Sequence, residues 1–485
     1  MAFDKWFPST ILQTKGTHRK PKKMNHFILT FVLFIFGTVA FSQRTFSDET
    51  FYDLVVKNHP LAKKATLKPR YGNFSVLKAK GGFDPKLSNE IDQKYYNSNQ
   101  YYSFINAGLK VPTWYGLEFK TGLEMNDGVY LNQENKTPQN GLVYAGVSMS
   151  LGQGLFIDQR RAELFKAKIY QSSSLCEQRL QLNELVYEAG YAYWNWALAY
   201  FSKEIMKESY ILASDRFEGV KQLAILGDRP PIDSVEAKIQ VQNRETLLRN
   251  YETDYFSSAF NLSTYLWTEN QVPLELDSLT FPVDLNTLEQ QKSLLLSSFQ
   301  IDTIVQNHPY LQINDFKIKS LEIDNRLKKE QLKPTLNLNY NLLNEPINSN
   351  PYNGLSINNY KWGLTFEMPL LLRKERGDLG LAKLKLQDEQ LSYDNNKAYL
   401  TFKIKKALND FENSLNQLEI IDRTVRDSKL LLEAEKELFV TGESSLFLIN
   451  ARELSYIQAR LKLIECIVKV QQAKLSYTFA IAGFY

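Results

Sequence analysis

The chain of 485 residues is 44% hydrophobic, 23% charged and 13% aromatic, a composition typical of folded or membrane-associated proteins and not of disordered ones. Its two cysteines, Cys176 and Cys466, are too few for a disulfide framework or a four-thiolate metal site. The four histidines form no cluster of the kind that binds catalytic zinc, so a conventional zinc enzyme is excluded and no cofactor is expected. Without residues 1–43, 52 basic residues face 53 acidic ones, and this balance indicates no nucleic-acid surface.

Residues 1–43 have the parts of a secretory signal peptide preceded by a basic leader. Residues 19–23 are a basic cluster, residues 27–41 are an uncharged apolar run, and Ala40-Phe41-Ser42 is a small-x-small cleavage site. The apolar run is short for a transmembrane helix, so an N-terminal anchor is the weaker alternative. Met24 is an alternative start. We therefore predict an exported protein.

The remaining sequence shows an internal duplication. Asn58-His59-Pro60 recurs 249 residues later as Asn307-His308-Pro309. Two later matches share an offset of 215 residues, and together the matches predict two structural repeats, residues 44–285 and 286–485. The difference between the offsets places 34 additional residues in the first repeat, between about residues 61 and 153. The two later matches pair residues 164–168 with 379–383, and Gly227-Asp228 with Gly442-Glu443.

Each repeat begins with a short helix, at residues 46–69 and 296–333, and continues with strands, at about 83–150 and 335–368. Four segments of about nine residues alternate between apolar and polar side chains. Both a soluble sandwich and an outer-membrane barrel contain such strands, and the export signal favours the barrel. A weaker pair, near residues 87–95 and 101–111, fits the additional residues. This pair could be a hairpin outside the barrel, which we favour, or extra strands in a wider barrel.

Two segments of about 70 residues, 156–226 and 370–441, then lack proline and predict helices roughly 105 Å long. Apolar residues in both segments step by three and four, which indicates helices packed nearly parallel to one another. Trp194 and Trp196 lie within the first of these segments and are expected in the core or at an interface rather than in a ligand site. In the first segment these apolar residues are Leu182, Val186, Ala189, Tyr193, Trp196 and Tyr200. In the second segment they are Ile404, Leu408, Phe411, Leu415 and Leu418.

Gly227 and Gly442 follow the long helices, at positions where a helix would end and the chain would reverse. The returning helices, about residues 232–267 and 443–482, are only about 60 Å long. The short helices at the start of each repeat could stack end to end with them and complete the length. Residues 269–285 predict an irregular linker between the repeats.

This order of elements resembles the TolC-type outer-membrane efflux protein family over nearly the whole mature chain. The likeness rests on the two Asn-His-Pro motifs, the strand-to-helix junctions at residues 155–161 and 369–372, and the turn-helix segments at 227–237 and 442–451. The resemblance implies an α+β membrane protein that forms a homotrimer, in which each protomer gives about four strands to one barrel. It also implies a periplasmic tunnel of long helices beneath the barrel.

The resemblance further implies a passive exit duct in the outer membrane of a Gram-negative bacterium. Such a duct serves tripartite efflux or type I secretion of small molecules or proteins. Its partners would be a periplasmic adaptor, an inner-membrane transporter and outer-membrane lipid, and it would perform no chemistry. The strand count agrees, because four strands cannot enclose a channel and open sheet edges cannot face lipid.

The family closes its tunnel at the periplasmic tip with acidic residues after the second-repeat turn. The matching positions, Phe447 and Asn450, are not acidic here, so the gate could be an apolar constriction or a rearranged carboxylate ring. Helix capping is an equal alternative for the acids of the first-repeat turn, and packing between helices is favoured for Phe447. The candidate tip residues are Gly227, Asp228, Asp233, Glu236, Gly442, Glu443, Phe447 and Asn450.

A periplasmic adaptor or coiled-coil scaffold without a pore is the alternative function. An adaptor needs one helical hairpin beside a β-rich domain, whereas this sequence predicts two hairpins and ends on a helix. An adaptor would leave the membrane without detergent, and a barrel would not. An enzyme is not predicted, because no nucleophile–base pair, phosphate loop or metal cluster is present in the sequence.

Overall fold

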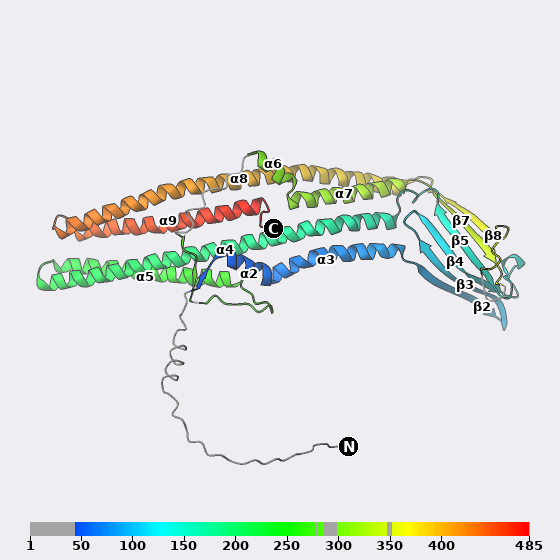
Figure 1. Cartoon of the computed structure of the whole chain (residues 1–485), viewed down its shortest axis with the longest axis horizontal. Helices are drawn as coiled ribbons and strands as arrows, with labels where there is room; N and C mark the ends of the chain where they lie inside the picture. The colour runs from blue at the N-terminus through cyan, green and yellow to red at the C-terminus, as the bar shows by residue number, and fades with distance from the viewer. Residues whose placement is uncertain (1–43, 278, 286–297, 347–351, 485) are drawn as a thin grey trace, which may run out of the picture. The chain divides into compact units, whose positions relative to one another are not determined.

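The computed structural model describes residues 44–277, 279–285, 298–346 and 352–484, so the predicted signal peptide lies outside the described residues. Thr45–Tyr485 form one compact unit. In this unit two long helical hairpins run from their turns to an antiparallel sheet at the opposite end (Figure 1). Among the described residues, no helix combines the length and the apolar composition needed to cross a membrane.

The two long helices are α4 (Gln159–Leu226) and α8 (Arg373–Val440), each of 68 residues, or about 100 Å at 1.5 Å per residue. Both predicted long helices are therefore confirmed within three residues. They return as α5 (Pro231–Ser263) and α9 (Leu446–Ala480). Gly227 and Gly442 lie in the turns with φ of 86° and 82°, a backbone conformation that favours glycine at the end of a helix.

Four shorter helices complete the bundle: α2 (Asp48–Asn58), α3 (Pro60–Lys80), α6 (Ser298–Gln306) and α7 (Pro309–Glu330). Helix α3 packs along α4, and α7 packs along both α4 and α8. Along these long helices, α3 and α7 occupy the part nearer the sheet, whereas α5 and α9 occupy the part nearer the turns (Figure 1). The predicted end-to-end arrangement is thus observed. The division of the chain into two duplicated repeats stays a prediction.

The repeated Asn-His-Pro motif begins a helix at both of its occurrences. The Nδ1 atom of His59 accepts a hydrogen bond from the backbone N–H of Leu61 at 3.2 Å, and His308 accepts one from Tyr310 at the same distance. The proline that follows each histidine occupies the first turn, where its missing N–H costs no intrahelical bond. The sequence pattern thus marks two helix N-caps.

Six strands form one antiparallel sheet in the order β2-β3-β4-β5-β7-β8. The prediction of about four strands was wrong, because the additional residues of the first half pair with the rest. Strand β3 bonds to β4 over ten residue pairs, so the hairpin that we favoured outside the barrel instead extends the sheet. The strands are β2 (Lys86–Tyr96), β3 (Asn99–Pro112), β4 (Leu117–Asp127), β5 (Leu142–Ser150), β7 (Thr335–Asn344) and β8 (Tyr360–Glu367).

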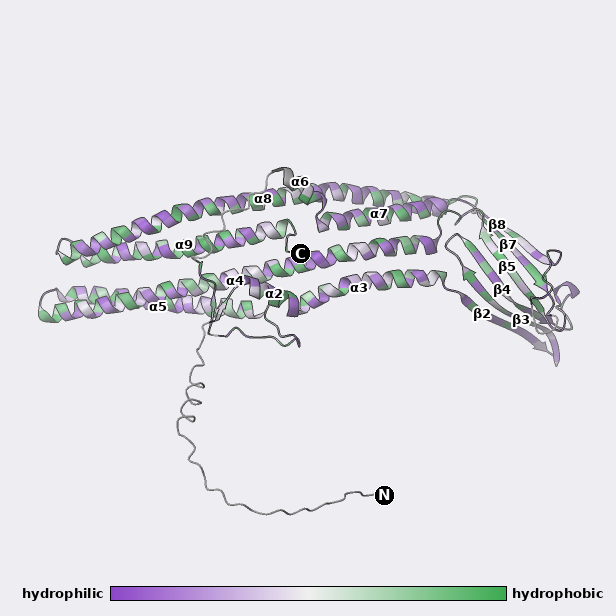
Figure 2. Ribbon diagram, viewed as in Figure 1, coloured by the Kyte–Doolittle hydropathy of each residue, from purple (hydrophilic) through white to green (hydrophobic). Residues whose placement is uncertain are grey.

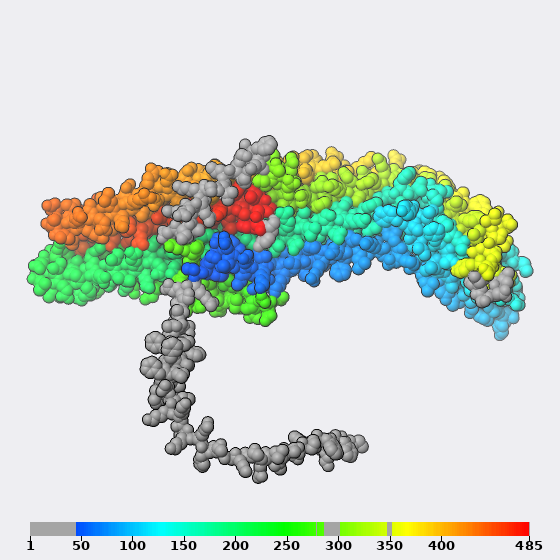
Figure 3. Space-filling view, in the orientation of Figure 1, coloured from blue at the N-terminus to red at the C-terminus, as the bar shows by residue number. Residues whose placement is uncertain are grey.

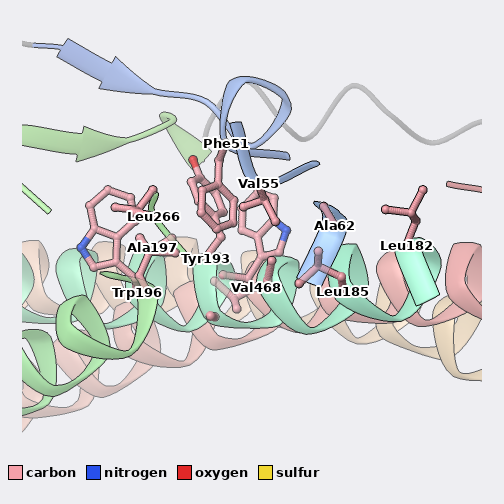
Figure 4. Packing of buried hydrophobic residues seen from close by; sticks show 14 of the residues in the cluster. Phe51, Val55, Ala62, Leu182, Leu185, Tyr193, Trp196, Ala197, Leu266 and Val468 are labelled. Atoms are coloured by element: carbon pink, nitrogen blue, oxygen red, sulfur yellow. The ribbon is translucent and has the colours of Figure 1, made fainter. Parts of the chain in front are cut away.

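The largest hydrophobic core surrounds the middle of α4, where α2 and α9 pack against it (Figure 4). Tyr193 and Trp196 are fully buried and Trp194 nearly so, which confirms that the tryptophans belong to the core. The Tyr193 hydroxyl donates a hydrogen bond to the backbone oxygen of Phe46 at 2.6 Å. Phe46 belongs to β1 (Arg44–Phe46), which pairs with β6 (Thr280–Pro282) inside the predicted linker.

Outside this core, apolar residues are scattered along the whole length of the helices (Figure 2). Near the turns, the first-half hairpin and the second-half hairpin lie directly against one another on the face shown in Figure 3, in agreement with the contact between α4 and α9. Cys176 and Cys466 are buried and unbonded to one another, and a free buried cysteine packs like a small apolar residue.

Candidate functional site

The register of the six strands separates their side chains into a polar and an apolar face. Residues paired across an antiparallel sheet point to the same side, so each row of pairs can be followed from β2 to β8. One row consists almost entirely of lysines and small polar residues, whereas a neighbouring row on the other face is apolar. The first is Lys86, Lys110, Lys120, Gly146, Asn341 and Lys361, and the second is Leu87, Leu109, Thr121, Ala145, Leu342 and Tyr360.

Carboxylates and amides balance the lysines on the polar face. The Nζ atom of Lys120 lies 3.7 Å from a carboxylate oxygen of Glu118 and donates to Asn339 at 3.1 Å. Lys361 lies 4.0 Å from Glu124. These partners belong to β4, β7 and β8, so charge pairing crosses the sheet on this face. A surface of this kind suits contact with water.

A tyrosine covers two glycines in the middle of the polar face. Gly108, Gly122 and Tyr144 share one row on β3, β4 and β5. A Cβ atom at either glycine would lie within 2.6 Å of the Tyr144 ring or hydroxyl group, so only glycine leaves room for the ring. The Tyr144 hydroxyl group donates to Asn106 at 3.3 Å. An aromatic ring that covers strand glycines in this way stabilises a curved sheet.

Aromatic side chains gather at both ends of the strands. At the end beside the helices, Trp114 packs against Phe83 and Phe165 with ring centroids 5.5 and 5.4 Å apart. At the far end, Tyr101 packs against Tyr96 and Tyr130 at 5.8 and 4.5 Å. Rings at these two levels border the apolar face, as aromatic girdles border the lipid-facing band of membrane barrels.

The junction between β5 and α4 holds both arginines of the predicted strand-to-helix motif. Arg161 is buried, donates to the backbone oxygens of Leu155 and Gly154, and lies 3.3 Å from Asp158. Asp158 also caps α4 by accepting from the N–H of Arg161 at 2.8 Å. Arg160 lies 3.7 Å from Glu118. Both arginines therefore fix the junction between sheet and helix.

The candidate tip residues divide between two turns whose helices pack together. Val220, Ala237 and Leu446 form a small core from α4, α5 and α9. Asp228 and Glu443 are exposed beside their glycines. Asp233 lies in the first turn of α5, with its carboxylate 3.9 Å from Arg229. Glu236 lies on the same helix, directly before the buried Ala237. The place of Asp233 agrees with a dipole-compensating role as well as with a gate.

The two non-acidic candidates differ from one another. Phe447 is 68% exposed, and its neighbour Leu446 enters the small core instead. The packing that we favoured for Phe447 is therefore absent within one chain. Asn450 is buried, and its Oδ1 atom accepts a hydrogen bond from Arg216 at 3.0 Å.

Asn450 belongs to a buried ionic cluster that the sequence did not reveal. Arg216 of α4 makes two hydrogen bonds, of 2.7 and 2.9 Å, to the carboxylate of Glu453 on α9. Arg244 of α5 lies 3.5 Å from the same carboxylate and donates to Ser209. Burial lowers the pKa of Arg244, and the Glu453 carboxylate opposes this shift. The cluster ties the first hairpin to the second because its members come from three helices.

No sequence signal joins these three residues, which are 28 to more than 200 positions apart. Their charges alone resemble those of a solvated helix face. In addition, the described part of the chain contains no group of three or more His, Cys, Asp or Glu side chains that could hold a metal ion. The site thus consists of a polar sheet face and a cluster of ion pairs that joins the two hairpins.

No protein-family model and no curated protein sequence matches the chain. Solved structures match it over 90% of its length. The open state of the MtrE outer membrane channel of Neisseria gonorrhoeae matches at 14% identity and a TM-score of 0.67, over 89% of that chain. The Campylobacter jejuni CmeC outer membrane channel matches at 14% identity and 0.62, over 86%. The Vibrio cholerae outer membrane protein VceC matches at 12% and 0.62, over 96%. The predicted fold is confirmed: the chain folds like these outer membrane channels.

Proposed function

We propose that the protein is the outer-membrane channel of a tripartite efflux or type I secretion system, a passive exit duct for small molecules or proteins. The observation that carries the proposal is the division of one six-stranded sheet into a polar and an apolar face, joined to helices about 100 Å long. The apolar face contacts lipid, and the polar face lines water.

The height of the sheet fits a bilayer. Strand β4 has 11 residues, which span roughly 28 Å along the barrel axis at the usual rise and tilt. An apolar band of about 25 Å between aromatic girdles is typical of outer-membrane barrels. A soluble adaptor would have to expose this whole face to water, and such a large apolar patch is rare on soluble proteins.

The chain completes its channel only with other copies of itself. Six strands do not enclose a channel, because the smallest membrane barrels have about eight. Helix α8 also carries exposed large apolar residues, among them Leu384, Leu391, Tyr399 and Phe402. The resemblance to the TolC family supports three copies, and neighbouring copies then cover this face.

The helices form the periplasmic part of the duct, and their turns form its entrance. There an adaptor protein links the duct to an inner-membrane transporter. The ionic cluster of Arg216, Arg244 and Glu453 holds the two hairpins of one protomer together. Asp228, Asp233, Glu236 and Glu443 are the carboxylates available to line the entrance, and exposed Phe447 is the candidate for an apolar constriction.

A pair of cysteine variants tests which face lines the pore. Asn339 lies on the polar face of β7 and Leu338 lies next to it on the apolar face. In planar bilayers, a charged thiol reagent should reduce the single-channel conductance of Asn339→Cys and leave that of Leu338→Cys unchanged. A conductance that responds only in Leu338→Cys, or a purified protein that never conducts, would contradict the proposed duct and favour the adaptor.

A further inference from the structure

The sheet has two open edges, β2 and β8, and each exposes one row of backbone groups. Leu343 donates to Asn359 across β7 and β8, whereas Leu151 donates to Leu336 across β5 and β7. The hydrogen-bonded pairs between β7 and β8 are thus polar-face residues, and those between β5 and β7 are apolar-face residues. Because each strand residue bonds to only one of its two neighbouring strands, this alternation continues across the sheet. At both open edges this alternation leaves the N–H and C=O groups of the apolar-face residues unpaired.

The direction of the strands allows one copy to continue the sheet of another. All five pairings are antiparallel, and the number of strands is even. Strand β8 therefore runs opposite to the β2 of a neighbouring copy placed beside it. An edge in lipid needs such a partner, because its backbone groups find no water there.

Charged side chains mark both edges on the polar face. Strand β2 carries Lys86, Glu90, Asp92 and Lys94 on this face, and β8 carries Lys361 and Glu367. Within the described residues, Lys86, Asp92 and Glu367 form no ion pair, and Lys361 reaches Glu124 only at 4.0 Å. These four charges are available to a neighbouring copy.

Building on the proposed channel, we infer that β8 of one copy pairs with β2 of the next in a single register. That register sets Glu367 opposite Lys86 of the next copy and Lys361 opposite Asp92 of the next copy. Both pairs join opposite charges on the polar face, which is favourable between directly opposed strand residues. On the apolar face the same register sets Phe366 opposite Leu87 and Trp362 opposite Ile91.

The neighbouring registers that keep both faces in place bring like charges together. A shift by two residues in one direction sets Lys361 opposite Lys94. In the other direction it sets Glu367 opposite Asp84, although it also sets Lys361 opposite Glu90. A shift by one residue would turn the polar side chains of β8 toward the apolar face of β2. Of these registers, only the inferred one has two opposite-charge pairs and no like-charge pair.

The inferred register also gives a barrel of ordinary geometry. The row that starts at Lys86 reaches β8 at Lys361, and the joint continues it at Asp92 of the next copy, six residues further along β2. Three copies then give eighteen strands and a stagger of eighteen residues. A barrel whose stagger equals its strand number has strands tilted by about 36°, within the usual range for outer-membrane barrels.

A stagger of four residues per copy would lower the tilt to about 26°, outside that range. Because diameter grows with strand number, eighteen strands make a barrel about half again as wide as one of twelve. The hairpin of β2 and β3 thus serves to widen the pore and to form its joint.

Helices beside the two edges support the same neighbour. Helix α3 leads into β2 and exposes Tyr71, Phe74 and Leu77 along its length. Helix α8 follows β8 and exposes its own apolar side chains, including Tyr399 and Phe402. A copy that joins β8 to β2 brings these two helices together, so one interface continues from the sheet into the bundle.

Disulfide trapping tests the register in the full chain with Cys176→Ala and Cys466→Ala. In the inferred joint the charged pairs are not hydrogen-bonded to each other, so their Cα atoms lie about 4.5 Å apart, within reach of a disulfide. Lys361→Cys is combined in turn with Glu90→Cys, Asp92→Cys and Lys94→Cys. Only the combination with Asp92→Cys should give, on oxidation, a covalent species of three chains that reductant converts to one.

The other outcomes separate the inference from the proposed function. Cross-linking with Glu90→Cys or Lys94→Cys instead would overturn the register while the sheet edges still join. No cross-link in any variant, with normal conductance after reduction, would overturn the joint and leave the channel intact. No cross-link and no conductance in the wild type would overturn both. A covalent pair of chains that never reaches three would contradict the eighteen-stranded barrel.

Discussion

The two long helices, α4 and α8, have the same length and very different surroundings. Of 68 residues in each, 25 are buried in α4 and only 8 in α8. Helix α4 contacts α3, α5, α7 and α9, whereas α8 has its main contacts with α7 and α9. Helix α4 is therefore the interior of one chain, and in the proposed channel the exposed α8 is the surface that another copy covers. Substitutions in the two helices should therefore damage different levels of assembly.

The largest effect is expected from Trp196→Ala in the middle of α4. The indole is fully buried, so its removal should lower the free energy of unfolding by about 3–5 kcal/mol. The urea midpoint of the detergent-solubilised protein measures the loss. A midpoint within error of the wild type would show that the core around α4 does not carry the fold.

A comparable loss is expected from Glu453→Gln, which removes the charge that ties α4 and α5 to α9. Two arginines would remain without their buried partner, at a cost of about 3–5 kcal/mol. Glu208→Gln is the matched control, because Glu208 pairs with Arg460 at 2.8 Å on the exposed surface, where pairs contribute at most about 1 kcal/mol. Equal urea midpoints for the two variants would contradict the structural role of the cluster.

His308 lines a pocket with residues of α4, α8 and α9, and it should make stability depend on pH. Burial is the main cause that lowers the pKa of His308 to about 4 from an ordinary 6.5. The folded chain therefore binds fewer protons than the unfolded chain between these values. The contribution of neutral His308 to the free energy of unfolding is fully present above about pH 6.5. It should fall by about 3 kcal/mol as the pH approaches 4.

His308→Asn should remove this dependence, because asparagine can cap α7 in the same way and does not titrate there. Melting temperatures between pH 4 and 7 measure the difference between the variant and the wild type. Parallel curves for the two proteins would show that another group causes the acid sensitivity.

A smaller effect of a different kind is expected from Phe402→Ala in α8. The ring is 68% exposed in one chain, so the fold of the protomer should be unchanged. Loss of its burial against a neighbouring copy should weaken assembly by about 1–3 kcal/mol per interface. Light scattering on dilution should show dissociation at higher protein concentration than in the wild type. Unchanged assembly would mean that this face of α8 stays uncovered.

The smallest effect concerns the inferred joint at the sheet edges. Glu367→Lys would place two lysines opposite one another, and the loss should be about 0.2–1 kcal/mol per joint. Combining it with Lys86→Glu should restore the opposite-charge pair. The temperature at which the heated oligomer dissociates should fall in the single variant and recover in the double variant. Additive losses in the double variant would argue against the pairing.

Regular local patterns explain what the sequence could predict. Apolar residues spaced by three and four predicted the positions of α4 and α8, and glycines predicted their turns. The alternation of apolar and polar residues predicted the strands. The additional strands near 87–95 and 101–111 were also found, as β2 and β3. Their place in the sheet was not, because pairing between β3 and β4 depends on register rather than on composition.

The candidate site was harder to predict from the sequence, because it too depends on which distant segments pack together. The polar strand faces could be read directly from alternation. Arg216, Arg244 and Glu453 could not, because only the packing of three helices brings their charges together. Asn450 was singled out by its position after the turn, and its bond to Arg216 became visible only in three dimensions. Phe447 is likewise exposed because its neighbour Leu446, and not Phe447 itself, points into the core.

In the proposed function this chain forms a channel only as several copies. Planar-bilayer conductance of the detergent-extracted protein, with its mass determined by light scattering, is the most direct test. We predict discrete, ohmic conductance steps from a particle of three chains. A soluble monomer that leaves the membrane without detergent and never conducts would contradict the account.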